Sequence, residues 1–219
     1  MKPTAAHDPE FIAAAVTTER LALCDLLEEL DADDWRQQSL CDSWTVHDVV
    51  AHLSLATRET LRGMLQGMIK ARGNWERMNA DQAITQARQF PPQVLVQQLR
   101  DSASSTRRAP MSNPIDPLID ILVHAQDIAR PLGRKHLMAY ERVEPALTFA
   151  VESRWYGASK RFNGLTLAAT DGSWTFGTGD RGLAGPAGDL LLVAAGRTAG
   201  MSALTGSGVD VLQQRIGPA

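Results

Sequence analysis

Apolar residues at helical spacing in the first 135 residues are the feature that most constrains the fold of this chain. Four long segments carry the pattern, at residues 9–30, 46–71, 92–107 and 117–130. Apolar positions three or four residues apart form one stripe on a helix, and that stripe is buried against other elements. Four such helices with modest connections predict a four-helix bundle.

Two of these helices begin at recognisable start signals. Thr45 and Asp48 match the capping-box pattern, in which each side chain hydrogen-bonds to the backbone N–H of the other residue. Asp116 is predicted to cap the fourth helix, with Pro117 at its first position, where proline is favoured. Both signals agree with the starts that the apolar pattern predicts.

The sequence changes character after the fourth helix. A helical segment at about 142–159 is followed by two β-prone runs, 165–170 and 173–177, which flank the pair Asp171–Gly172. An Asp-Gly pair between such runs predicts a β-hairpin. Further short helices are expected toward the C-terminus.

These patterns predict a mainly α chain with two domains. Residues 1–138 are expected to form the four-helix bundle, and residues 139–219 a small α+β domain with a β-hairpin near 165–177. The length of 219 residues is compatible with this organisation.

Composition excludes several classes of partner. The net charge is −3, and acidic and basic residues are interspersed, so nucleic-acid binding is not expected as the main function. No apolar run approaches the roughly 18 residues that span a bilayer. The first ten residues lack the apolar core of a signal peptide. A cytoplasmic protein without a membrane partner is therefore expected.

One histidine and one carboxylate–histidine pair are the candidates for chemistry. His52 lies on the apolar side of the second helix, and Asp120 and His124 are four residues apart on one face of the fourth. Across a bundle these three side chains can hold a divalent metal with an open coordination position, as in catalytic zinc sites. The alternative is that His52 is a hydrogen-bonded core residue and that Asp120 and His124 form an ordinary pair.

Two segments around these residues resemble a known family. The run LCDSWTVHDVVAHL at 40–53 and the run VHAQDIARPLG at 123–133 resemble the mycothiol-dependent maleylpyruvate isomerase family of the DinB superfamily. The C-terminal stretches 169–174 and 185–192, with Gly196–Arg197, resemble it too. The resemblance thus extends over almost the whole chain.

The resemblance implies a DinB-like four-helix bundle with a divalent metal, usually zinc, between its helices. Nickel is the alternative ion. The family ligands correspond to His52, Asp120 and His124. The isomerases carry glutamate at the position of Asp120, and aspartate is one methylene shorter, so the ion is expected closer to this helix or bridged to it by water.

The resemblance also implies a function. Mycothiol, a low-molecular-weight thiol, would serve as cosubstrate, and its thiolate would add to a small electrophilic substrate, giving isomerisation or thiol transfer. Arg197 is the candidate anchor for an acidic substrate, with Arg130, Arg154 and Arg161 as competitors. Two alternatives stay open, a non-catalytic metal- or ligand-binding DinB-type stress protein and a bundle without metal. The expected oligomeric state is a monomer or a homodimer.

Several other residues carry predictions. Cys24 is expected in the core, and Trp44 is expected to pack. Cys41 is either a packed small residue or a reactive thiol. Asp127 either orients an imidazole or forms a salt bridge with Arg130 at the helix end. Three histidines are expected at the surface: His7, His47 and His136.

Overall fold

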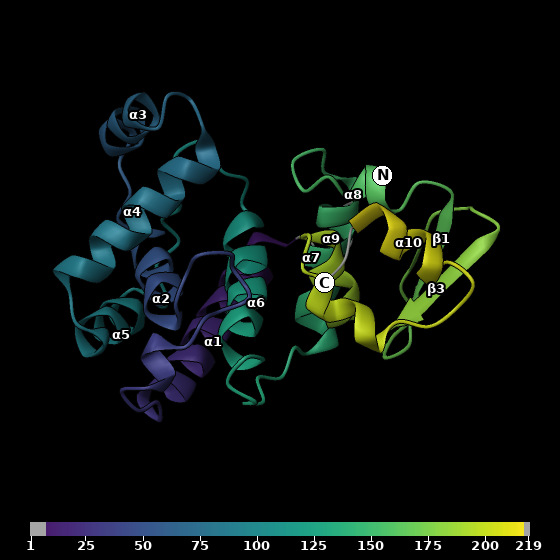
Figure 1. Ribbon diagram of the computed structural model, residues 1–219, viewed down its shortest axis with the longest axis horizontal. Coiled ribbons are helices and arrows are strands. Elements are labelled where there is room, and N and C mark those ends of the chain that lie inside the picture. Colours follow the sequence, from purple (N-terminus) through teal and green to yellow (C-terminus); the bar gives the residue numbers. More distant parts are fainter. Residues whose placement is uncertain (1–7, 217–219) are drawn as a thin grey trace. The chain divides into compact units, whose positions relative to one another are not determined.

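The computed structural model describes residues 8–216 and is mainly helical, with one small sheet (Figure 1). The chain divides into two compact units, one formed by Pro9–His136 and one that contains the chain from Leu137 onward. Over the described range, none of the helices combines the length and the apolar character needed to cross a membrane. His7 lies outside the described residues.

The first unit contains the predicted four-helix bundle. Its helices are α1 (Pro9–Glu28), α2 (Val46–Leu55), α5 (Pro92–Asp101) and α6 (Asp116–Ala129), and α1 and α2 each pack against both α5 and α6. A short 3-10 turn, η2 (Asp34–Arg36), precedes α2. The core consists of side chains on the apolar stripes of the four helices, among them Leu23, Leu27, Val49, Leu95, Leu99, Leu118, Ile121 and Leu122.

The start of α2 is as predicted, whereas the start of α6 differs. Thr45 and Asp48 form the complete capping box. Ile115, not Asp116, is the N-cap of α6, and no side chain caps this helix. The Asp116 carboxylate turns back and accepts a hydrogen bond of 2.6 Å from the backbone N–H of Asn113. It therefore closes the preceding turn instead of capping the helix.

The single helix predicted at 46–71 is wrong, because the segment contains two helices. α2 ends at Leu55, and α3 (Leu61–Lys70) begins after Thr60. The backbone of Thr60 is extended, and its hydroxyl accepts a hydrogen bond of 3.1 Å from the N–H of Gly63. Thr60 is thus an N-cap in the middle of an apolar pattern that continues on both sides.

α3 and α4 (Trp75–Gln89) flank the bundle. α4 packs against both α2 and α3. One face of α3 contacts α4 through Met64, whereas its outer face exposes Leu61, Leu65 and Ile69. α3 is therefore only partly enclosed.

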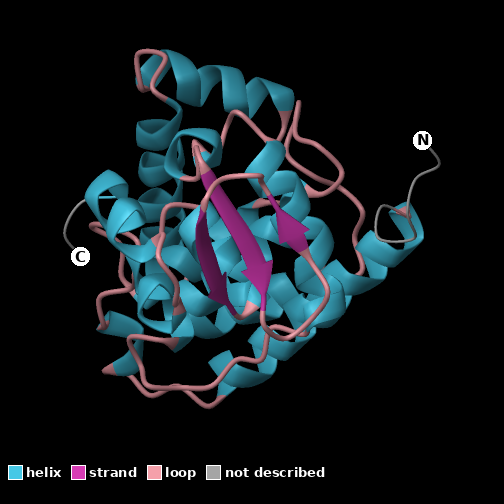
Figure 2. Ribbon diagram, turned by 90° about the vertical axis from the view of Figure 1, so that its right-hand side faces the viewer, coloured by secondary structure: helices cyan, strands magenta, loops and turns pink. Residues whose placement is uncertain are grey.

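The second unit contains a three-stranded sheet with the strand order β2-β1-β3, seen face-on in Figure 2. β1 (Leu165–Ala169) pairs antiparallel with β2 (Thr175–Phe176), as the predicted hairpin requires, and Leu167 lies opposite Phe176. β3 (Arg181–Gly185) pairs parallel with β1 and was not predicted, because its segment is rich in glycine.

Helices complete the second unit. The apolar helix α9 packs against α7 and η3 and is buried along its whole length. The helical elements of this unit are α7 (Tyr140–Glu152), α8 (Ala158–Arg161), α9 (Ala187–Ala194), η3 (Thr198–Ala203) and α10 (Val209–Ile216).

Candidate metal centre

α2 presents His52 at the edge of the bundle core. The capping box fixes the start of this helix, and Val49, Val50 and Leu53 bury its inner face. The His52 side chain lies beside that face and keeps 21% of its surface exposed. The imidazole is thus positioned by a rigid helix and is still accessible to solvent.

α6 supplies the other two members of the group. Asp120 and His124 are one turn apart, and Oδ1 of Asp120 lies 3.4 Å from Nε2 of His124 and 3.4 Å from Nε2 of His52. The three ligand atoms lie within 4.8 Å of one another. The three residues singled out from the sequence therefore meet in space.

These distances fit a metal ion better than hydrogen bonds. A contact of 3.4 Å is long for a nitrogen–oxygen hydrogen bond. Zinc bonds of about 2.0–2.2 Å to nitrogen and oxygen in tetrahedral geometry give a ligand–ligand separation of about 3.4 Å. Two imidazoles and a carboxylate match the donors of catalytic zinc sites, which keep a fourth position open.

Trp44 packs against both imidazoles. Its ring centroid lies 5.3 Å from that of His52 and 6.2 Å from that of His124. The indole is almost completely buried. The packing predicted for Trp44 is confirmed, but this residue also forms an apolar wall of the site, which the sequence did not indicate.

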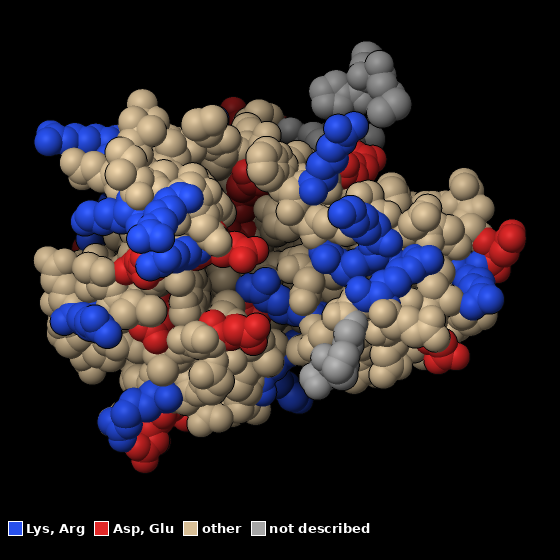
Figure 3. All heavy atoms as spheres, turned by 45° about the horizontal axis from the view of Figure 1, so that its top comes forward, with Lys and Arg blue, Asp and Glu red and all other residues tan. Residues whose placement is uncertain are grey.

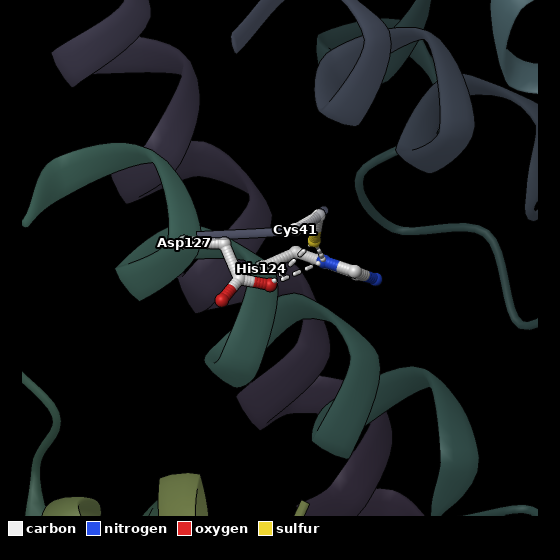
Figure 4. A group of neighbouring side chains, drawn as sticks. All are labelled: Cys41, His124 and Asp127. Atoms are coloured by element: carbon white, nitrogen blue, oxygen red, sulfur yellow. Dashed lines mark hydrogen bonds and ion pairs between the residues drawn. The ribbon is translucent and has the colours of Figure 1, made fainter. Parts of the chain in front are cut away.

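A second group lies on the other side of the His124 ring (Figure 4). Nδ1 of His124 lies 2.8 Å from Oδ2 of Asp127, and the Cys41 thiol donates to the same oxygen at 3.1 Å. Asp127 is completely buried. When Nδ1 carries the proton and donates it to Asp127, Nε2 keeps a lone pair toward His52 and Asp120.

The charges of the group shift its pKa values in opposite directions. Burial raises the pKa of Asp120, but the charge of His52 and the hydrogen bonds from both imidazoles outweigh it and hold this pKa well below its usual value. Burial lowers the pKa of His124, but hydrogen bonds with Asp120, Asp127 and Cys41 raise it well above its usual value. Without a metal, both shifts favour a protonated His124 beside an ionised Asp120, whose Oδ1 lies 3.4 Å from Nε2 of His124.

A comparison with known protein families finds a match in the first unit. Residues 16–119 match the sequence model of the mycothiol maleylpyruvate isomerase N-terminal domain. The matched segment lies within the unit Pro9–His136. The match ends one residue before Asp120, so it includes His52 but neither Asp120 nor His124.

The isomerase fold extends over both units. The crystal structure of the mycothiol-dependent maleylpyruvate isomerase has a TM-score of 0.64 to this chain, with 15% sequence identity, and covers 94% of this chain and 96% of its own. A histidine-to-alanine mutant of that enzyme gives the same values. At this identity the likeness shows the fold alone. No curated protein matches the chain in sequence.

The contact of Asp127 with His124 fits the predicted role of an orienting group. Its carboxylate faces His124, as an orienting group does, and the guanidinium Nε of Arg130 donates to Gln126 at 2.9 Å. Cys41 approaches Asp127 from a loop 86 residues earlier in the chain, which no local pattern could indicate.

The candidate substrate anchor lies in the other unit of the isomerase fold. Arg197 is half-buried just before η3, and its guanidinium donates to the carbonyl of Ala195 at 3.3 Å. Arg161 donates to the carbonyls of Tyr156 and Ala194, at the C-terminal end of α9. Figure 3 shows Lys and Arg side chains gathered on one face of this unit, on its right-hand side, which suits an anionic ligand.

The structure also tests the predictions for Cys24 and His136. Cys24 is completely buried, as predicted. The surface position predicted for His136 is wrong, because its side chain is only 4% exposed and its Nε2 lies 3.1 Å from Oε2 of the buried Glu19. His47 is half-buried, with Nε2 3.1 Å from the carbonyl of Phe90.

Proposed function

We propose that this protein is a metal-dependent enzyme that uses a low-molecular-weight thiol, mycothiol, to isomerise a small electrophilic substrate or to transfer the thiol to it. The observation that carries the proposal is the convergence of His52, Asp120 and His124 at separations that suit a tetrahedral ion. The match to the isomerase domain supports mycothiol as the thiol. Zinc is the proposed ion, with nickel as the alternative.

Each residue has a definite part in this proposal. Nε2 of His52, Nε2 of His124 and a carboxylate oxygen of Asp120 would hold the ion. A divalent zinc ion with these ligands lowers the pKa of a coordinated thiol, which is then held as the more nucleophilic thiolate. Asp127 keeps His124 in the tautomer that presents Nε2 to the ion. Trp44 excludes water from one side of the group.

The chemistry proposed for the substrate is reversible addition. A thiolate that adds to a conjugated double bond leaves a single bond that can rotate before the thiol is released. Transfer results when the thiol stays on the substrate. Arg197 is proposed to bind a carboxylate of the substrate, since a guanidinium matches a carboxylate in both charge and shape.

The first experiment tests the metal. Purified protein is expected to contain about one zinc or nickel ion per chain, and His52→Ala should lower its zinc affinity at least roughly a hundredfold, because it removes a direct ligand. His47→Ala is the matched control on the same helix and should bind zinc normally. Protein without stoichiometric metal, unchanged by His52→Ala, would contradict the proposal.

The second experiment tests the thiol and separates an enzyme from a plain binding protein. The metal-loaded protein is titrated with mycothiol and then supplied with small unsaturated acids and alkylating electrophiles. Saturable, metal-dependent thiol binding and turnover are expected, with Arg197→Ala raising KM for acidic substrates more than Arg197→Lys. Metal binding without thiol binding would favour the non-catalytic stress protein.

A further inference from the structure

The inner side of the His124 ring carries a second set of metal-ligand atoms. Sγ of Cys41, Nδ1 of His124 and Oδ2 of Asp127 converge there (Figure 4). This set shares only His124 with the group that contains His52. The set joins a thiol, an imidazole and a carboxylate. Thiolate donors favour soft ions such as cadmium over magnesium or calcium.

The distances within this inner set are close to those around a tetrahedral ion. Sγ of Cys41 lies 3.6 Å from Nδ1 of His124. Zinc bonds of about 2.3 Å to sulfur and 2.0–2.1 Å to nitrogen give a separation of about 3.6 Å. The two contacts to Asp127, at 3.1 and 2.8 Å, are shorter because hydrogen atoms join these groups. Replacing them with an ion requires a shift of only about half an ångström.

The loop before α2 holds Cys41 in place. The carbonyl of Cys41 accepts hydrogen bonds from the side chain of Gln38 at 2.8 Å and from the N–H of Trp44 at 3.1 Å. The N–H of Leu40 donates to the carbonyl of Asp127 at 3.0 Å and joins the loop to α6. The backbone is therefore fixed around the half-buried Cys41.

We propose that Cys41, His124 and Asp127 form a second cation site, which prefers soft divalent ions such as cadmium, on the inner side of the His124 ring. Binding releases the thiol proton of Cys41 to solvent, and the ion is held by the thiolate, the carboxylate of Asp127 and Nδ1 of His124. The proton of neutral His124 then resides on Nε2. The ring can offer only one nitrogen at a time in its neutral form.

The two sites therefore exclude each other. An ion on Nδ1 removes His124 from the group with His52 and Asp120. This competition rests on the proposed function, whereas the existence of the inner site does not. A thiophilic ion held by Cys41, His124 and Asp127 would thus inhibit metal binding by His52, Asp120 and His124.

Cadmium titration of the full-length, metal-free protein tests the inner site, with the ultraviolet thiolate-to-cadmium absorption band as the readout. The band is expected in the wild-type protein and in His52→Ala, because His52 is not a ligand of the inner site. Cys41→Ser should abolish it and weaken cadmium binding at least about tenfold, while its hydroxyl still donates to Asp127.

Cys24→Ala is the matched thiol control and should keep the band. The Cys24 thiol contacts the carbonyl of Val96, which is not part of the cluster, and burial raises the pKa of Cys24 to about 11. A wild-type protein without the band, a band that survives Cys41→Ser, or a band lost in His52→Ala would overturn the inner site. Competition is tested by zinc binding, which cadmium should weaken more strongly in the wild type than in Cys41→Ser, where cadmium can compete only for His52, Asp120 and His124.

Discussion

α6 and α3 belong to the same unit but differ in how deeply they are buried and in whether they carry candidate site residues. α6 is buried along almost its whole inner length, from Leu118 to Ala129, and carries all the ionisable residues that converge on His124 except His52 and Cys41. α3 buries one methionine and leaves Leu61, Leu65 and Ile69 more than half exposed. The charged side chains are therefore on the helix that is held most firmly, which fixes their geometry.

The most damaging change to α6 is expected at Asp127. Asp127→Ala removes the acceptor of both the His124 imidazole and the Cys41 thiol in a fully buried place. The free energy of unfolding should fall by roughly 2–4 kcal/mol, and zinc affinity by about 10–100-fold. Chemical denaturation and zinc titration measure the two effects.

Asp127→Asn is the control for this change, because its amide oxygen can still accept from Nδ1 of His124. It should keep more zinc affinity than Asp127→Ala. An alanine variant with wild-type stability and zinc affinity would show that α6 needs no orienting group.

The effect of zinc on stability should grow with pH. The pKa of His124 is raised in the folded metal-free protein, so its stabilising contribution is complete below the unfolded pKa of about 6.5 and is lost as pH rises through the folded value. Zinc requires the neutral imidazole. The increase in Tm caused by zinc should therefore be larger at about pH 8 than at about pH 6, by several degrees.

Thermal melts with and without zinc at both pH values check this expectation. His52→Ala, which weakens the site without changing α6, should show little zinc effect at either pH. An increase in Tm that is independent of pH would mean that zinc does not compete with the proton on His124. Asp120 adds a separate contribution, present above its unfolded pKa of about 3.9 and lost at lower pH.

Asp120 allows a finer test of the α6 geometry. Asp120→Glu keeps the charge and adds one methylene, so zinc affinity should stay within roughly tenfold of the wild type. Asp120→Asn loses the charge and should bind zinc more weakly than either. Equal affinity of the wild type and Asp120→Asn, measured by competition with a chelator, would remove this carboxylate from the ligand set.

The smallest effect is expected on α3. Leu65→Gln changes a side chain that is 53% exposed, so the free energy of unfolding should change by less than about 0.5 kcal/mol. Zinc affinity should stay unchanged. Met64→Gln, on the buried face of the same helix, is the control and should destabilise the unit clearly. A large effect of Leu65→Gln on either quantity would show that α3 is coupled to the site.

Local signals were sufficient for much of the fold and for the convergence of His52, Asp120 and His124. The capping box at Thr45 and Asp48 fixes the register of α2 and so places His52. The spacing of Asp120 and His124 places both on one face of α6. The Asp-Gly pair between two β-prone runs gave the pairing of β1 with β2.

Contacts that compete with local signals, or that lie far apart in sequence, could not be predicted. Thr60 ends an apolar pattern that continues beyond it, so the break between α2 and α3 was missed. β3 has little strand propensity, and its pairing with β1 stabilises it. The approach of Cys41 to Asp127 depends on how a loop folds onto a helix 86 residues later.

The pair formed by Glu19 and His136 also affects the order in which contacts form while the chain is synthesised. It joins the first helix of the bundle to a residue 117 positions later, at the end of the unit. A nascent chain that ends at Arg130 would contain all three proposed zinc ligands but would lack the imidazole that lies 3.1 Å from the buried Glu19 carboxylate. This contact can therefore form only after His136 has left the ribosome, when synthesis of the second unit has already begun.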